Sequence, residues 1–119
     1  MAKKSKKKIG TVDISLERQG TFSVIFRKVG LVSEEPTIDM LRQLLSNERI
    51  RMIHVINSEK PKSMYNLAKQ LGRDFKAVKN DLLLLKRFGV IDLEKVKEKG
   101  REKLKPVLEL KGIQINLSF

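Results

Sequence analysis

The sequence predicts an α+β fold in which a β-hairpin precedes a series of helices, a second β-hairpin and a closing strand. The main observation is the spacing of apolar residues, which changes twice along the chain. Apolar residues recur with a period of two in residues 11–29, with a helical period in residues 33–88, and with a period of two again from residue 90. The chain has 119 residues, of which 40% are hydrophobic and 34% charged, so we expect one packed domain.

Residues 1–10 are expected to form a disordered basic tail, because AKKSKKK offers nothing to bury. Such a tail either stays solvated or attracts DNA phosphates without choosing a sequence. The lysines concerned are Lys3, Lys4, Lys6, Lys7 and Lys8.

Residues 11–31 are expected to form the N-terminal β-hairpin, with RQG as the turn signal between its strands. A two-stranded hairpin is marginally stable alone, so its apolar face needs the main domain or a second subunit. The alternating apolar positions are Val12, Ile14 and Leu16, followed by Phe22, Val24 and Phe26.

Two helices are expected next, the first within residues 33–46, where Ser33 and acidic residues surround Pro36. Asn47 is the expected N-cap of the second helix, which should end at Lys60 before a proline. The expected buried positions of this second helix are Ile50, Ile53, Val55 and Ile56.

A further pair of helices is expected on either side of a tight turn. Ser63 is the N-cap signal of the first, Gly72 its left-handed C-cap, and Asp74 the N-cap of a helix that runs to about Phe88. In this last helix Leu83 lies about 100° away from the core positions and needs another neighbour. Those core positions are Val78, Leu82, Leu85 and Phe88.

The segment after Gly89 alternates as two strands around the polar tip KEKGREK, followed by the closing strand GIQINLSF. If Val96 packs inward, alternation turns Lys95, Lys97 and Lys99 outward. Residues 94–105 contain six basic and three acidic residues, so this hairpin is expected to be basic.

Three helices, a tight turn between the last two, and a following hairpin describe a winged helix-turn-helix domain, here expected over residues 33–119. In that arrangement the helix after the turn enters the DNA major groove and the hairpin, or wing, lies on the backbone or in the minor groove. The expected contacts are Arg73, Lys76, Lys79 and Asn80 from the helix, and Lys97, Lys99, Arg101 and Lys103 from the wing.

Composition narrows the function. The formal net charge of +12 favours a polyanionic partner, with double-stranded DNA preferred. The chain has no cysteine, a single histidine (His54), no Gly-rich phosphate loop and no HExxH motif, so we expect no enzymatic activity, no cofactor and no metal site. No apolar run has the length of a membrane span, so we expect a cytoplasmic, nucleoid-associated protein.

The stretches LLSNERIRMIHVI and YNLAKQLGRDFKAVKNDLLLLKRFGVIDLE resemble the archaeal and bacterial MarR/ArsR-like winged-helix regulators. The resemblance covers about residues 44–94, is strongest to regulators with a LARxxGRDxKxVxxDLxxLexxGLI core, and implies a homodimeric, DNA-binding transcription regulator. Metal sensing, which many ArsR-type relatives perform through cysteine or histidine clusters, is not expected here. The matching positions are Leu67, Ala68, Gly72, Arg73, Asp74, Lys76, Val78, Asp81, Leu82, Leu85, Gly89 and Ile91.

The leading hypothesis is therefore a sequence-specific regulator of transcription, with apolar residues of the N-terminal hairpin, the 36–46 helix and the closing strand forming a dimer interface. Two-fold symmetry would place paired recognition helices roughly 34 Å apart. Two alternatives remain open: an architectural, chromatin or partition-type protein with little sequence preference, and a winged-helix module for protein interaction.

Overall fold

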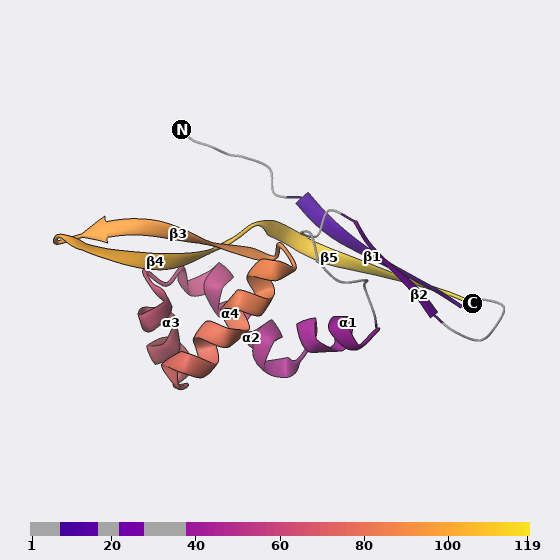
Figure 1. Cartoon of the computed structure of the whole chain (residues 1–119), viewed down its shortest axis with the longest axis horizontal. Coiled ribbons are helices and arrows are strands. Elements are labelled where there is room, and N and C mark those ends of the chain that lie inside the picture. Colours follow the sequence, from indigo (N-terminus) through magenta and orange to yellow (C-terminus); the bar gives the residue numbers. More distant parts are fainter. Residues whose placement is uncertain (1–7, 17–21, 28–37) are drawn as a thin grey trace.

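The computed structural model describes residues 8–16, 22–27 and 38–119 (Figure 1). The fold is α+β, as the sequence predicts. The helices are α1 (Ile38–Leu44), α2 (Asn47–Glu59), α3 (Met64–Leu71) and α4 (Phe75–Arg87), and the strands are β1 (Lys8–Leu16), β2 (Phe22–Arg27), β3 (Ile91–Glu98), β4 (Arg101–Leu108) and β5 (Leu110–Ser118).

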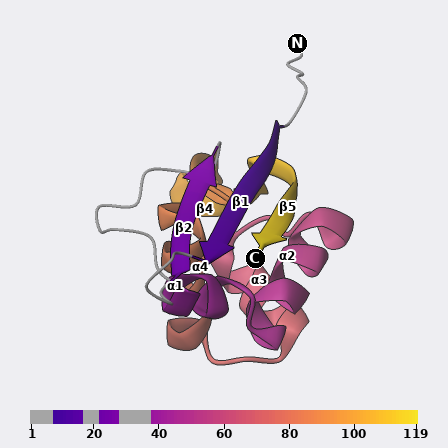
Figure 2. The ribbon, with the colours of Figure 1, turned by 90° about the vertical axis from the view of Figure 1, so that its right-hand side faces the viewer.

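The strands form two separate sheets. β3 and β4 form the expected antiparallel hairpin by themselves, whereas β1, β2 and β5 form a three-stranded sheet in the order β2-β1-β5. β1 and β2 pair antiparallel, which confirms the N-terminal hairpin, and β5 runs parallel to β1. In Figure 2 the three strands run side by side, with α1 below β2 and β1 and with α2 on the β5 side.

The N-terminal strand begins earlier than expected. Lys8 pairs with Leu110 and Ile9 with Gly112, so residues 8–10, which the sequence placed in the tail, belong to β1. The reason is non-local: β5 provides a partner for these residues that no neighbouring segment could reveal. Some predictions lie outside the described residues. These are the turn at residues 17–21, the start of the first helix within residues 28–37, and the tail lysines Lys3, Lys4, Lys6 and Lys7. The side chains of β2 are not described either.

The start of α2 differs by one residue from the prediction. Ser46, not Asn47, is the N-cap, because its side chain accepts a hydrogen bond from the backbone N–H of Arg49. The expected buried face of α2 was also partly wrong. Met52 and Ile56 are buried, whereas Ile50 is 46% exposed.

The two helices around the central turn agree with the prediction. Ser63 and Asp74 cap α3 and α4 by accepting hydrogen bonds from the backbone N–H groups of Asn66 and Ala77. Gly72 ends α3 in the left-handed conformation, with φ +65°. The turn therefore fixes the direction in which α4 leaves α3.

One hydrophobic core joins the helices to the β1-β2-β5 sheet. The predicted core positions of α4 are confirmed, since Val78, Leu82, Leu85 and Phe88 are all at most 1% exposed. The same cluster includes residues from α1, α2, α3 and the sheet, namely Leu41, Leu44, Met52, Ile56, Leu67, Val12 and Ile14.

The chain crosses from one sheet to the other at Glu109, between β4 and β5. The backbone N–H of Glu109 donates to the carbonyl oxygen of Val90 at 2.8 Å, which ties the crossing to the end of α4. β4 and β5 consequently run along the molecule as one long ribbon (Figure 1).

The orientation expected for Val96 was wrong. Ile91 and Pro106 are buried, and strand alternation places Leu93, Lys95 and Lys97 on the same face as Ile91. Val96 lies on the opposite face and is 37% exposed. The face of the hairpin that packs on the helices is therefore the one that contains the buried Ile91, and not the one that contains Val96.

Candidate nucleic-acid interface

The exposed face of α4 carries the predicted recognition-helix residues other than Arg73. Lys76, Lys79 and Asn80 are exposed, and within the described residues their side chains form no hydrogen bond or ion pair. They lie opposite the buried positions of the same helix. Leu83 shares this face and is 43% exposed, so it lacks the core neighbour that the other leucines of the run have.

Arg73 has a different position from the one predicted. Its Nη1 lies 2.9 Å from Asp81 Oδ2, its Nε lies 3.6 Å from Glu48 Oε2, and its side chain is only 19% exposed. On the other side of Asp81, Arg49 Nε donates a hydrogen bond of 3.1 Å to Oδ1. Arg73 is thus part of a partly buried ion network, and its predicted contact with DNA stays a prediction.

This network holds α4 in place. Asp81 lies on the buried side of α4, between two guanidinium groups that come from α2 and from the turn before α4. A carboxylate in such a position requires compensating charge. The sequence signal that was missed is therefore Asp81 itself, an acid among the apolar core positions of the helix.

The β3–β4 hairpin presents the predicted wing cations. Its tip is the two-residue turn Lys99-Gly100, in which both residues have positive φ, 52° and 78°. Turns of this kind match the twist of the flanking strands. Lys97, Lys99 and Arg101 are exposed, and Lys103 forms a 3.1 Å ion pair with Glu98 while its side chain remains 41% exposed. Three of the four predicted wing cations therefore have no acidic partner within the described residues.

A cleft of about 530 Å³ lies between the hairpin and the starts of α3 and α4. Tyr65 and Phe75 stand on its helical side, with ring centroids 6.2 Å apart, and Tyr65 is 62% exposed. Lys69 Nζ lies 5.5 Å from the centroid of the Tyr65 ring. The residues that line the cleft are Ser63, Met64, Tyr65, Phe75, Arg101, Lys103 and Leu104.

Sequence reasoning did not identify this cleft. The available signal was Tyr65, the only tyrosine, which precedes Asn66 and falls outside the core positions Met64, Leu67 and Leu71 of α3. What the sequence could not show is that Phe75 and β4 close the cleft from the other sides. The cleft places Phe75, the first residue of α4, across from the hairpin cations Arg101 and Lys103. The predicted recognition-helix residues of α4 are not among the residues that line it.

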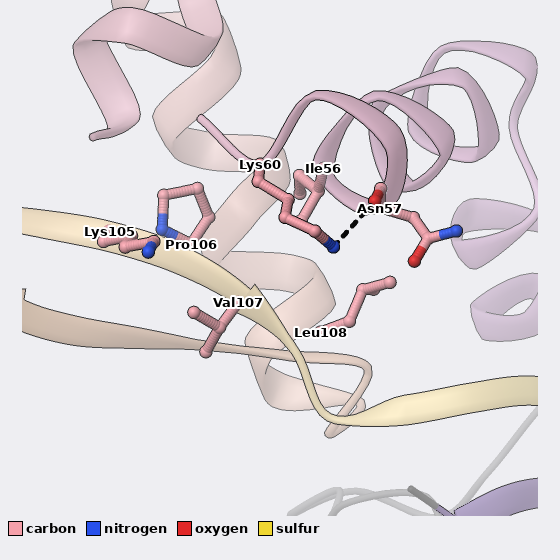
Figure 3. A pocket seen from close by; sticks show the side chains of 7 residues that line it. All are labelled: Ile56, Asn57, Lys60, Lys105, Pro106, Val107 and Leu108. Carbon is pink, nitrogen blue, oxygen red and sulfur yellow. Dashed lines mark hydrogen bonds between the residues drawn. The ribbon is translucent and has the colours of Figure 1, made fainter. Parts of the chain in front are cut away.

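A smaller cavity of about 120 Å³ lies at the opposite end of β4, against the C-terminal end of α2 (Figure 3). Lys60 and Lys105 both line it, and Lys60 Nζ donates to the carbonyl oxygen of Asn57 at 3.3 Å. This contact is local to α2. The cavity is separate from the cleft beside α4 and adds no residue to the candidate interface.

We define the basic surface as the unpartnered side chains of α4 together with the wing cations: Lys76, Lys79, Asn80, Lys97, Lys99, Arg101 and Lys103. In the part of the chain that the structure describes, no three metal-ligating side chains gather in one place. Among its helices, none combines the length and the apolar character that crossing a bilayer requires.

Comparison with known proteins gave one result. The model of a protein family, HVO_A0114, matches residues 44–115, from the end of α1 into β5. No curated protein and no solved structure matches the chain.

Proposed function

The chain belongs to the HVO_A0114 family, and we propose that it is a sequence-specific, double-stranded DNA-binding regulator of transcription that acts as a homodimer. The order of α2, α3, α4 and the β3–β4 hairpin supports the proposal, because the same order of elements is expected of a winged helix-turn-helix domain such as that of the MarR/ArsR-like regulators that the sequence resembles. In this proposal α4 is the recognition helix and the hairpin is the wing.

The observation that carries the proposal is the basic surface. Lys76, Lys79 and Asn80 lie on the exposed side of α4 and have no partner among the residues that the structure describes, whereas the opposite side of the same helix is buried. A helix about 10–12 Å wide fits a major groove about 12 Å wide, so such a face is available to base edges. The hairpin across the cleft then reaches the adjacent backbone.

The side chains of α4 match base-edge chemistry. Lysine donates to the acceptors of guanine, and the amide of Asn80 pairs with adenine. Leu83 lies between these groups, where an exposed apolar side chain contacts a thymine methyl group. Arg73 pairs with Asp81, and in this proposal it contributes by holding α4 in place.

The test compares a reading-face variant with a charge-matched control. The Lys76→Ala/Lys79→Ala/Asn80→Ala variant removes two charges from α4, and Arg42→Ala/Arg51→Ala removes two from α1 and α2. On a duplex selected by the wild-type protein from random DNA, the first variant should bind about tenfold to hundredfold more weakly. The control should bind within about twofold of the wild type. Full affinity in a folded reading-face variant would contradict the proposal.

The net charge of +12 favours a second candidate, an architectural protein that coats DNA with little sequence preference. The two candidates differ in the ratio of affinities for the selected duplex and for random duplex at one fixed salt concentration. A ratio of about 1000 or more supports the regulator. A ratio near one supports the architectural protein.

A further inference from the structure

The free edge of β5 borders an apolar groove that the basic surface does not use. The groove has a volume of about 380 Å³ and runs between β5 and α2. Figure 2 shows α2 on the β5 side of the sheet, away from β2. We call it the α2–β5 groove; its apolar lining comes from Leu45, Ile50, Ile53, Leu110, Ile113 and Ile115.

Burial on the apolar face of the sheet stops at β5. Val12 and Ile14 of β1 are at most 7% exposed, because the helices cover them. Their register partners on β5, Ile115 and Leu117, lie on the same face and are 41% and 54% exposed. On the helical side of the groove, Ile50 is 46% exposed. Ile115, Leu117 and Ile50 thus extend the apolar core to the surface, and nothing in the described structure covers them.

The groove also differs in charge from the rest of the molecule. In a chain with 34% charged residues, the segment from Gly112 to Phe119 has none. Lys111 is the only Lys, Arg, Asp or Glu side chain that lines the groove. Depletion of charge around exposed apolar residues is the composition of a protein interface core and does not suit a polyanion.

The backbone of β5 is available along its outer side. Among the described strands β5 pairs only with β1, so its other edge presents unpaired N–H and C=O groups over nine residues. Proteins block such edges with proline, inward-pointing charges or bulges. β5 has no proline, its one register shift against β1 lies at its start, at Lys111, and after Lys111 it has no charge. The edge is therefore open to another strand.

We propose that the α2–β5 groove is occupied by β5 of a second copy of this chain, paired antiparallel across a two-fold axis. Antiparallel pairing of two identical strands is self-complementary, so one edge supplies both halves of the interface. The two three-stranded sheets then join into one six-stranded sheet, and the partner strand covers Ile50 and Ile53. A nine-residue strand is about 30 Å long, which suits an interface of roughly 800 Å² per copy.

This inference specifies the dimer of the proposed function and rests on it, yet it is tested without DNA, so the two can fail separately. The full-length protein is sedimented at a series of concentrations. The wild type should be a dimer, and Ile115→Glu/Leu117→Glu should be a monomer with unchanged helical circular dichroism. The control Val96→Glu places one such charge on a side chain of the hairpin whose exposure is similar to that of Ile115, and it should remain a dimer.

Cysteine cross-linking covers the case in which the glutamate variant fails to fold. The chain has no cysteine, and Gly112, Gln114 and Asn116 lie on the face of β5 opposite Ile115, where a small side chain leaves the groove intact. At least one of the three single-cysteine variants, alone or mixed with another of the three, should form an intermolecular disulfide faster than Val96→Cys, because directly paired strands bring Cα atoms within disulfide range.

Three results would overturn the inference. The first is a wild-type protein that remains a monomer at every concentration. This result includes the case in which the α2–β5 groove of the monomer binds an apolar small molecule or a peptide of another protein. The second is a folded glutamate variant that is still a dimer. The third is a set of β5 cysteines that cross-link no faster than the hairpin control.

Discussion

The two sheets of this molecule differ in the charge of their edge strands. β4 carries Arg101, Lys103 and Lys105 at alternate positions, and the tip between β3 and β4 adds Lys99. β5, the next strand of the same ribbon, carries no charge after Lys111 and leaves apolar side chains exposed. Charge along an edge discourages pairing with another strand and attracts phosphate, whereas an uncharged edge permits pairing.

This difference in charge distinguishes the helices and the β3–β4 hairpin from the β1-β2-β5 sheet. The helices and the hairpin form a unit with a buried apolar core, and the exposed side of α4 and the hairpin carry most of the candidate DNA-binding cations. The β1-β2-β5 sheet shares the core of that unit on one side but leaves it incomplete at β5. Surface charge therefore marks where a polyanion is expected, and missing charge marks where a copy of the protein is expected.

The largest effect is expected for Asp81→Ala, which tests what holds the helical unit together. It leaves the guanidinium groups of Arg49 and Arg73 partly buried without their carboxylate. We expect the free energy of unfolding to fall by about 3 kcal/mol, measured by urea denaturation. Asp39→Ala is the matched control, because its ion pair with Arg42 is largely exposed and should contribute at most about 0.5 kcal/mol. Equal losses would show that the network does not fix α4.

The next effect compares one cation on each edge. Arg101→Ala removes an exposed charge from the hairpin, and Lys111→Ala removes one from the start of β5. If only the hairpin meets phosphate, Arg101→Ala should lower the slope of log affinity against log salt by about one, and Lys111→Ala should leave the slope unchanged. A salt titration of DNA binding measures both. A reversed result would place the DNA on the β5 side.

Two glycines provide a third comparison, of about 1 kcal/mol. An added Cβ meets nothing within 4 Å at either Gly72 or Gly112, but only Gly72 has a positive φ. Gly72→Ala should therefore destabilise the protein by about 1 kcal/mol through backbone strain. Gly112→Ala should be neutral or slightly stabilising, because it restricts the unfolded chain. Thermal denaturation of both variants measures the two effects. Equal destabilisation would contradict the prediction, because it would show that the φ angle does not account for the difference between Gly72 and Gly112.

The smallest effect concerns the turn of the charged hairpin. Lys99 adopts φ 52°, a conformation that asparagine tolerates better than lysine. Lys99→Asn should raise the free energy of unfolding by about 0.5 kcal/mol. Lys97→Asn, in the extended part of β3, should not. A Lys99→Asn variant less stable than the wild type would contradict this view of the turn.

Local features were predictable from the sequence, and non-local ones were not. Ser63, Gly72 and Asp74 were identified because a cap acts on residues three or four positions away. The leucines of α4 were sorted correctly because helical periodicity places Leu82 and Leu85 on one face. The α+β class followed from these patterns.

The errors came from contacts that sequence spacing does not encode. The ion pair of Arg73 with Asp81, at 2.9 Å, was not predicted, because the spacing of the two residues along the chain does not show that they meet. Ile50 fits the periodicity of a buried position but faces the uncovered groove. The parallel pairing of β1 with β5 joins segments about a hundred residues apart, and alternation alone gives neither partner nor direction.

The length of the continuous β4–β5 ribbon sets the distance between the proposed DNA-binding surface and the proposed dimer interface. Residues 101–118 span roughly 60 Å at about 3.3 Å per residue, close to the longest dimension of the molecule, 58 Å. Glu109 is the single residue between β4, which carries cations of the proposed DNA-binding surface, and β5, which borders the proposed dimer interface. Inserting or deleting one residue there changes the spacing by one step and also inverts the face of every residue beyond it. The number of residues in this crossing thus sets the distance at which two copies can present their hairpins.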